Sequence, residues 1–450
     1  MKLTTFVAAL AGGCLATSAM AQSDALAQIA ELRAQLAAVQ AQAGNNTLTE
    51  ERANEIKSIV RDTLADADTR TSLQGGGAMA GYDNGFFMSS ADGNFKLKMG
   101  VLEQVRYVWQ FDNNDTMGFE NRRTQLAFGG NMFDPSWTYN VVFNFSPYDT
   151  QYGEYADNFD LADASITKSM DGGLAITAGQ FRTPFTRATL VGDGKQLMAD
   201  YSPTDYNFTA GYQQGIMGSW SSDMFRAMVS IGNGVGATNG TWSGASNADQ
   251  FNLAIRAEAK LAGSWSQFAK ETSFRGEEFG LLVGVAWMDT DGNGVGNYND
   301  DNVTANIDNN AITLDATAFF GGANVSAAYT YANSQYDAGD DAYGLSVQGG
   351  LFVTDGIEAW AGWNYIDGKA NAAGGGTSEA GNWIQVGANV YFAKNGCKWT
   401  TSVNIPVNDE TAQGYYYGGA WGMFEAGQTG AVTDDGTSDV SILTQLQFMF

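Results

Sequence analysis

The sequence contains no histidine, and this absence removes several classes of function. Without histidine the chain cannot build a Ser-His-Asp triad, a histidine-ligated zinc site or a histidine acid–base catalyst. Cysteine is nearly absent too: Cys14 and Cys397 are the two in the chain, and Cys14 lies in an expected leader, so we expect no intramolecular disulfide in the mature protein. A net charge of -26 argues against nucleic-acid binding. We therefore do not expect an enzyme.

Long apolar runs and proline are also scarce. After the N-terminus no run of 18 apolar residues occurs, so only a closed β-barrel could cross a bilayer. The chain has 56 Gly but 5 Pro and is rich in aromatic residues, a composition that favours strands joined by turns over helices.

The N-terminal 75 residues differ from the rest of the chain. Residues 1–21 are typical of a secretory signal peptide, with Lys2, an apolar core and a small-residue cleavage site before Gln22. Residues 22–75 have helical spacing with a short heptad seam, which predicts a periplasmic coiled-coil segment that associates between chains as a trimer stalk. A flexible linker is the alternative for this segment.

The pattern in residues 76–450 predicts one transmembrane antiparallel β-barrel of about 16 strands, so the expected fold class is all-β. The stretch 95–111 alternates apolar odd positions with mostly polar even positions, as a strand between lipid and water requires, with Glu103 and Leu102 as the exceptions. Fifteen further alternating segments follow, and long polar connections alternate with tight turns. The connection 262–277 is too long for a tight turn. The last segment, 440–450, ends on Phe450 and is similar to the assembly signal of outer-membrane barrels, which predicts the cell outer membrane.

Three stretches resemble the phosphate-selective porins O and P. They are GYDNGFF at 81–87, RRTQLAF at 122–128 continuing to FDP at 133–135, and GQFRTPF at 179–185. The resemblance implies a 16-stranded trimeric diffusion channel with an N-terminal coiled segment, a third outer loop folded into the lumen, and basic residues that favour anions.

Basic residues concentrate where this channel would be narrow. Lys96, Lys98 and Arg106 share the polar face of the first strand, and the third outer loop carries its own basic side chains. The candidate pore-lining residues are Arg182, Arg187, Lys195, Arg106, Arg123, Lys96 and Lys98. If they line the constriction, the pore prefers chloride to potassium. Solvated charges or headgroup contacts are the alternative, and the basic residues are too few for a dense phosphate ladder. Acidic side chains that can also reach the lumen are Asp160 or Asp163, Glu258, Asp315 and Glu358.

The outer loop 289–300 matches the order of a calcium-binding loop, although the final ligand is Asp in place of the usual Glu and no helices flank it. The candidate ligands are Asp289, Asp291, Asn293 and Asp300, with Gly294 at the turn. A Gly/Asn-rich turn without metal is the alternative. No other cofactor is expected.

Two functions remain open. The first is an outer-membrane diffusion porin for small hydrophilic solutes or inorganic anions, with a weak anion preference and a homotrimeric assembly in the lipid bilayer. The second is a structural outer-membrane anchor that tethers the membrane to the cell wall through the N-terminal stalk. Inner faces rich in small and polar residues favour an open lumen, and therefore the porin.

Overall fold

A computed structural model divides the chain into two units, residues 1–77 and 78–450. The structure describes residues 31, 34, 78–83, 85–111, 116–145, 160–208, 211–233, 251–291, 309–334, 341–367, 381–407 and 440–450. In the first unit Glu31 and Ala34 are helical and exposed, and the signal peptide and most of the expected stalk lie outside the described residues.

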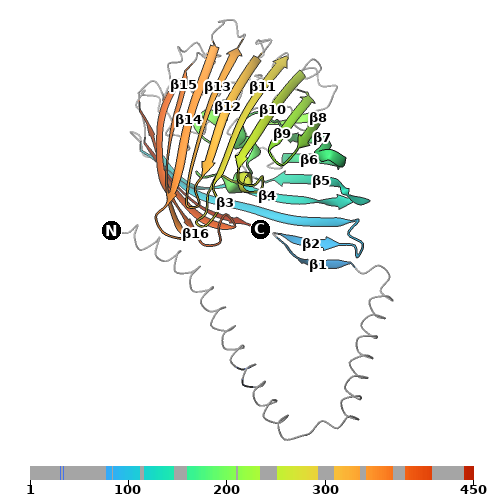
Figure 1. Cartoon of the computed structure of the whole chain (residues 1–450). Coiled ribbons are helices and arrows are strands. Elements are labelled where there is room, and N and C mark those ends of the chain that lie inside the picture. Colours follow the sequence, from blue (N-terminus) through green and yellow to red (C-terminus); the bar gives the residue numbers. More distant parts are fainter. Residues whose placement is uncertain are drawn as a thin grey trace. The chain divides into compact units, whose positions relative to one another are not determined.

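The second unit is a closed antiparallel barrel (Figure 1). Each strand from β3 to β18 pairs with the next, and β18 pairs back with β3, so 16 strands close the ring and confirm the predicted barrel. The strands are β3 (Lys96–Gln110), β4 (Thr116–Met132), β5 (Asp134–Asn144), β6 (Asp160–Ser169), β7 (Leu174–Arg182), β8 (Tyr212–Ser221), β9 (Phe225–Gly232), β10 (Phe251–Ala262), β11 (Gly280–Asp291), β12 (Asn309–Phe319), β13 (Ala323–Ser334), β14 (Asp341–Phe352), β15 (Ile357–Asp367), β16 (Gly381–Tyr391), β17 (Cys397–Pro406) and β18 (Ser441–Met449).

A short hairpin precedes the barrel. Strands β1 (Met79–Tyr82) and β2 (Phe86–Ser89) pair with each other, and β2 also pairs with the first four residues of β3. Because β18 pairs with β3 from Leu102 onward, the hairpin continues the sheet at the short-turn end of the barrel.

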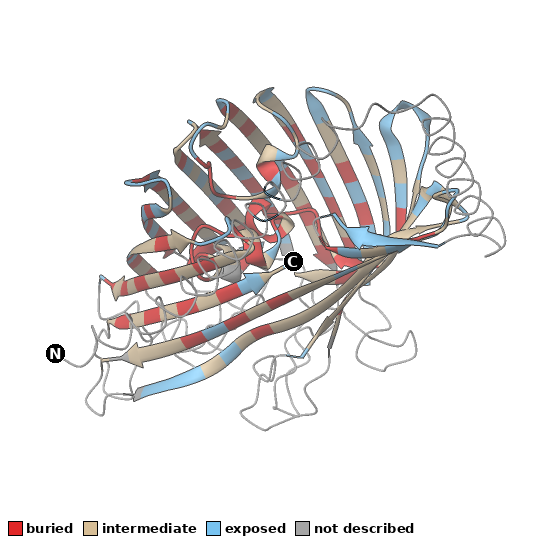
Figure 2. Ribbon diagram, turned by 90° about the horizontal axis from the view of Figure 1, so that it is seen from below, coloured by how far each residue is buried: buried red, intermediate tan, exposed pale blue. Residues whose placement is uncertain are grey.

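The alternation in the strands produces two different surfaces. Figure 2 shows buried residues alternating with less buried ones along many of the strands. Along β17, inner residues such as Lys398, Thr400 and Asn404 are buried, while the residues between them are half-buried. Large apolar side chains such as Ile176, Ile216 and Leu314 are exposed on the outer face. In a barrel this places hydrocarbon toward lipid and polar groups toward the lumen. Among the described residues, no helix has the length and apolar character needed to span a membrane.

The connection between β7 and β8 folds into the barrel. We call its described residues, 183–208 and 211, the lumen loop; it contains α3 (Arg187–Leu190), η3 (Asp193–Lys195) and α4 (Pro203–Phe208). At α4, Ser202 Oγ accepts a hydrogen bond from the Asp205 amide (3.0 Å) and Pro203 takes the first helical position, which is a favourable helix start. Two further short 3-10 turns are η2 (Asp171–Gly173) and η4 (Gln267–Ala269).

Candidate pore constriction

An apolar cluster inside the barrel fixes one side of the lumen loop. Phe185 and Phe208 of the loop pack with Trp383, Met288 and Ile366, which lie on the inner faces of β16, β11 and β15. Leu197 and Met198 form a second cluster with Trp360 of β15. Burial of large side chains at about 1.5–3 kcal/mol each holds the loop against this half of the wall.

Three arginines on the opposite wall converge on one carboxylate of the loop. Asp200 Oδ2 accepts hydrogen bonds from Arg106 Nη2 (2.6 Å) and Arg122 Nε (3.1 Å), and Asp200 Oδ1 accepts one from Arg123 Nη2 (2.6 Å). Burial alone would raise the pKa of Asp200, but the three guanidinium groups hold it well below its ordinary value. Asp200 is therefore a fixed anion at the centre of this cluster.

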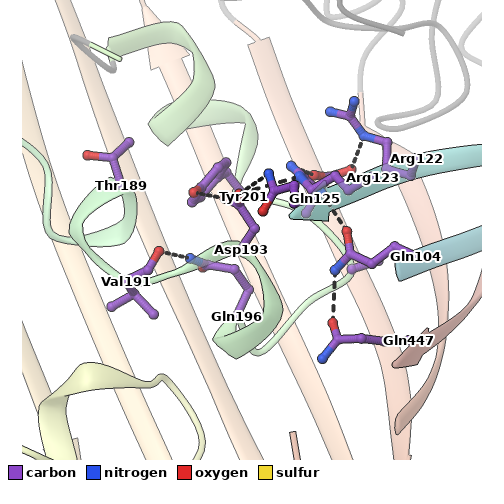
Figure 3. Close-up of polar contacts among 12 residues, drawn as sticks. Gln104, Arg122, Arg123, Gln125, Thr189, Val191, Asp193, Gln196, Tyr201 and Gln447 are labelled. Atoms are coloured by element: carbon purple, nitrogen blue, oxygen red, sulfur yellow. Dashed lines mark hydrogen bonds and ion pairs between the residues drawn. The ribbon is translucent and has the colours of Figure 1, made fainter. Parts of the chain in front are cut away.

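A β-bulge explains how two consecutive arginines reach the same point. Gln104 of β3 pairs with Arg123, whereas Val105 pairs with Asn121, so Arg122 is the extra residue in β4. A bulge redirects a side chain that would otherwise face the other side of the sheet. Arg123 Nη1 also donates to Gln104 Oε1 (2.9 Å), and Gln104 Nε2 donates to Gln447 Oε1 of β18 (2.8 Å; Figure 3).

A second carboxylate of the loop, Asp193, lies beside the first cluster (Figure 3). Arg182 Nη2 donates to Asp193 Oδ2 (3.1 Å), Gln125 Nε2 donates to the same oxygen (3.0 Å), and the Tyr201 hydroxyl donates to Oδ1. Burial would raise the pKa of Asp193, but Arg182 and Arg123 hold it below its ordinary value. Arg182 also donates to the Thr189 carbonyl (2.6 Å) and thus links β7 to the loop backbone.

The long connection between β10 and β11, residues 263–279, supports the lumen loop from the short-turn end, and we call it the inner turn. The Glu271 amide donates to the Lys195 carbonyl (3.0 Å), and the Leu197 amide donates to Glu271 Oε2 (2.9 Å). Arg187 donates to the carbonyls of Phe268 (3.1 Å) and Lys270 (3.3 Å). These contacts account for the unusual length of the connection.

The predicted pore-lining residues therefore have different environments. Arg106, Arg123 and Arg182 are bonded to carboxylates of the lumen loop, whereas Arg187 lies on the loop and is bonded to the inner turn and to β12. Lys195 lies on the loop, half-buried, and its ammonium group has no hydrogen bond or ion pair among the described residues. Lys96 and Lys98 lie together near the start of β3: Lys96 is 4.8 Å from the centre of the Phe87 ring, and Lys98 is 3.8 Å from Asp83. That these residues select the permeating ion stays a prediction.

The acidic side chains predicted to reach the lumen are largely bonded as well. Arg256 donates to Glu258 Oε1 (2.9 Å) and to both oxygens of Asp315 (2.7 and 2.9 Å). Glu358 accepts from Asn324 (2.8 Å) and Tyr391 (2.6 Å). Asp163 is half-buried opposite Val142, and Asp160 pairs with Asn144.

At the candidate constriction, sequence reasoning missed the roles of Arg122, Arg256, Asp193 and Asp200 and the contacts of the inner turn. The Arg122-Arg123 pair and the excess length of the connection 262–277 were the signals that the sequence offered.

For the calcium hypothesis, two of the four candidate ligands are described: Asp289 and Asp291 lie at the end of β11. Asn293 and Asp300 lie outside the described residues. Among the described residues, no group of three or more acidic or cysteine side chains could hold a metal.

Comparison with known proteins gives one family and one fold. The sequence model of the family described as phosphate-selective porin O and P matches residues 95–338. No curated protein matches the sequence significantly.

Solved structures with a similar fold are porins and related outer-membrane proteins. The anion-selective porin from Comamonas acidovorans has a TM-score of 0.53 at 13% identity, covering 79% of this chain and 99% of that chain. OmpF of Salmonella typhi in complex with daunomycin has a TM-score of 0.53 at 13% identity, covering 83% and 100%. The trimer form of in-vitro folded OmpT from Vibrio cholerae has a TM-score of 0.51 at 14% identity, covering 79% and 99%. At these identities the likeness establishes the fold.

Proposed function

Because the chain belongs to the phosphate-selective porin O and P family, we propose that it passes small hydrophilic solutes by diffusion with a weak preference for anions. The family and the closed barrel identify an outer-membrane diffusion porin. The solute class and the anion preference are the proposed part. An ordered loop inside a barrel supports permeation through a narrowed passage, where the fixed charges at the constriction govern ion preference.

The observation that carries the weak preference is the pairing of charges at the constriction. Arg106, Arg122, Arg123 and Arg182 pair with Asp193, Asp200 and Glu120, and Asp163 lies close enough to Arg182 to interact with it, so positive and negative charges in this group are nearly balanced. Lys195 adds another positive charge on the loop. Such a small excess of positive charge supports a modest chloride preference and argues against tight binding of phosphate.

Reversal potentials in asymmetric KCl test the proposal. Purified protein in a planar bilayer should form channels whose reversal potential lies on the anion side by a small margin, despite the net charge of -26. A cation-selective channel would show that charges outside the constriction dominate. Absence of conductance would favour the alternative function, a structural anchor held by the N-terminal segment.

We further propose that the protein is a homotrimer with a periplasmic stalk formed by residues 22–75. The heptad seam in this segment supports association between chains, and one fold relative was solved in a trimer form. Chemical cross-linking in mild detergent should trap trimers.

Calcium binding by the loop 289–300 also remains a proposal. Isothermal titration of the wild type and of Asp289→Asn with CaCl2 would test it.

A further inference from the structure

The inner wall of the barrel is covered unevenly. The inward residues of β10 that are at most 5% exposed are Asn252, Ala254, Arg256 and Glu258. The inward residues of β17 that are at most 3% exposed are Lys398, Thr400, Ser402 and Asn404. On β5 and β6, by contrast, Asn140 is exposed and its cross-strand partner Ser165 is half-buried. Solvent therefore reaches the inner wall at β5 and β6, whereas the inner faces of β10 and β17 are covered.

Inward side chains of two neighbouring strands define the open part of the wall. Ile166 of β6 is 48% exposed on the outer face, so the alternate residues of this strand point inward. Residues directly opposite share a face of the sheet, which places their partners in β5 on the same side. None of these inward residues is buried, and all but Val142 are polar. We call the set the β5–β6 wall: Thr138, Asn140, Val142, Asp163, Ser165 and Thr167.

The lumen loop crosses in front of the β5–β6 wall. Asp193 of the loop accepts hydrogen bonds from Gln125 of β4 (3.0 Å) and from Arg182 of β7 (3.1 Å). Because β4 pairs with β5 and β7 pairs with β6, the two donors flank the wall on either side. Within the described ranges, no hydrogen bond or ion pair joins the loop to the β5–β6 wall. The loop is therefore held at both flanks and leaves the wall between them accessible.

We propose that the permeation path runs between the lumen loop and the β5–β6 wall, and that Asp163 is a specificity-determining residue on this path. The inference rests on the proposed function as a diffusion porin. Hydroxyl and amide groups of the wall exchange hydrogen bonds with water and with hydrophilic solutes that pass. Asp163 lies close enough to Arg182 to interact with it, and a permeating ion feels charges within a Debye length of about 8 Å. The carboxylate therefore reduces the preference for anions that nearby basic side chains create.

Cysteine modification tests the position of the path. In a Cys397→Ala background, Ser165→Cys places a thiol on the β5–β6 wall, and Ser402→Cys makes the same change on β17, where Ser402 is 3% exposed. The thiolate attacks sulfonatoethyl methanethiosulfonate, forms a mixed disulfide and releases methanesulfinate. The added group should lower the single-channel conductance of Ser165→Cys by about half, because it narrows the path, whereas Ser402→Cys should keep its conductance. Asn140→Cys, on the same wall, should respond alike and replaces Ser165→Cys if that variant folds poorly.

Asp163→Asn tests the charge on the path. In asymmetric KCl its chloride-to-potassium permeability ratio should exceed that of the wild type by about twofold, since a fixed negative charge is removed from the path. Asp355→Asn is the matched control, because it makes the same change at a side chain that is 96% exposed in the turn between β14 and β15. Its permeability ratio should equal that of the wild type.

The outcomes distinguish this inference from the proposed function. A wild-type protein without conductance contradicts the porin and this path together. A conducting wild type whose Ser165→Cys and Asn140→Cys variants keep their conductance after modification would overturn the path alone. A drop in Ser402→Cys equal to that in Ser165→Cys would also overturn it, because the solutes would then pass along β17. Equal permeability ratios in Asp163→Asn and Asp355→Asn would contradict the role of Asp163.

Discussion

Lys195 differs from the arginines of the candidate constriction because its ammonium group has no hydrogen bond or ion pair within the described part of the chain. A fixed charge acts on passing ions within a Debye length of about 8 Å at physiological salt. We therefore expect Lys195→Glu to move the reversal potential toward cations in asymmetric KCl, and Lys195→Arg to leave it nearly unchanged. An unchanged reversal potential in Lys195→Glu would show that the passage lies elsewhere in the lumen.

Arg187 is a buried connector between the loop and the rest of the barrel. Besides the two carbonyls of the inner turn, it donates to Thr317 Oγ1 of β12 (2.9 Å). Arg187→Met should lower the free energy of unfolding by about 1–3 kcal/mol, because buried acceptors lose their donor. Thermal unfolding in detergent measures the change, with Lys195→Met as the control on the same loop. Equal midpoints for the two variants would contradict the connecting role. Arg187→Glu would therefore report loop damage more than ion selectivity.

Asp205 makes the stability of the folded protein depend on pH. Burial raises its pKa to about 7, with Glu271 and Asp315 adding to the rise and Ser202 and Arg187 opposing it. The folded state then binds more protons than the unfolded state between the ordinary pKa and about pH 7, so stability falls as pH rises through this range. Three pKa units correspond to about 4 kcal/mol. Asp205 is only half-buried, so solvent screening reduces the expected loss to about 2 kcal/mol.

Asp205→Asn should remove this dependence. We expect the variant to be more stable than the wild type at pH 8 and to differ little from it at pH 4, because the wild-type carboxyl is then largely protonated in the folded protein. Chemical unfolding followed by tryptophan fluorescence at pH 4, 6 and 8 measures this. A parallel pH profile for both proteins would assign the dependence to other groups.

At the scale of elements, the inner turn determines how rigidly the lumen loop is held. Besides its bonds to Lys195 and Leu197, Glu271 accepts a hydrogen bond from Gln348 of β14 (3.0 Å). Replacing residues 264–278 with a tight Asn-Gly turn removes these supports while β10 and β11 stay paired. We expect larger single-channel conductance and more frequent current fluctuations. Conductance and noise equal to the wild type would show that the two clusters at Phe185 and Leu197 suffice to fix the loop.

The strands were predictable from the sequence, while much of the constriction was not. Alternation over 95–111 matches β3 because lipid and water demand opposite faces, and each of the other fifteen segments corresponds to one strand. The bulge at Arg122 depends on pairing with β3, so the period of two within β4 does not reveal it. Asp200 and Asp193 lie in irregular backbone, where no period predicts direction. Besides Thr317, the partners of Arg187 are carbonyl groups of the inner turn, and backbone groups leave no sequence signal.

At the scale of the whole molecule, the outer face of β3 carries a carboxylate where lipid would be expected. Glu103 lies opposite Phe448 of β18 and Thr124 of β4, and residues directly opposite share a face of the sheet. Phe448 is 44% exposed on the outer face, so Glu103 points away from the lumen. It lies near the middle of β3, where a charge in contact with lipid is unfavourable. On the same face, Thr401 and Thr444 share a hydrogen bond (2.9 Å).

The polar side chains of Glu103, Thr124, Thr401 and Thr444 on this outer face favour contact with a second copy of the chain over contact with lipid. If the trimer buries the outer face of β17, β18, β3 and β4, Glu103 gains polar partners there, and Glu103→Leu should shift the protein from trimer toward monomer in cross-linking and native electrophoresis. Leu314→Glu is the control, because it adds a charge on the outer face of β12, where Leu314 is 50% exposed. We expect this variant to insert less well into membranes, with an unchanged trimer fraction in the protein that does insert. If Glu103→Leu keeps the wild-type trimer fraction while raising barrel stability, the carboxylate faces lipid and the interface lies on other strands.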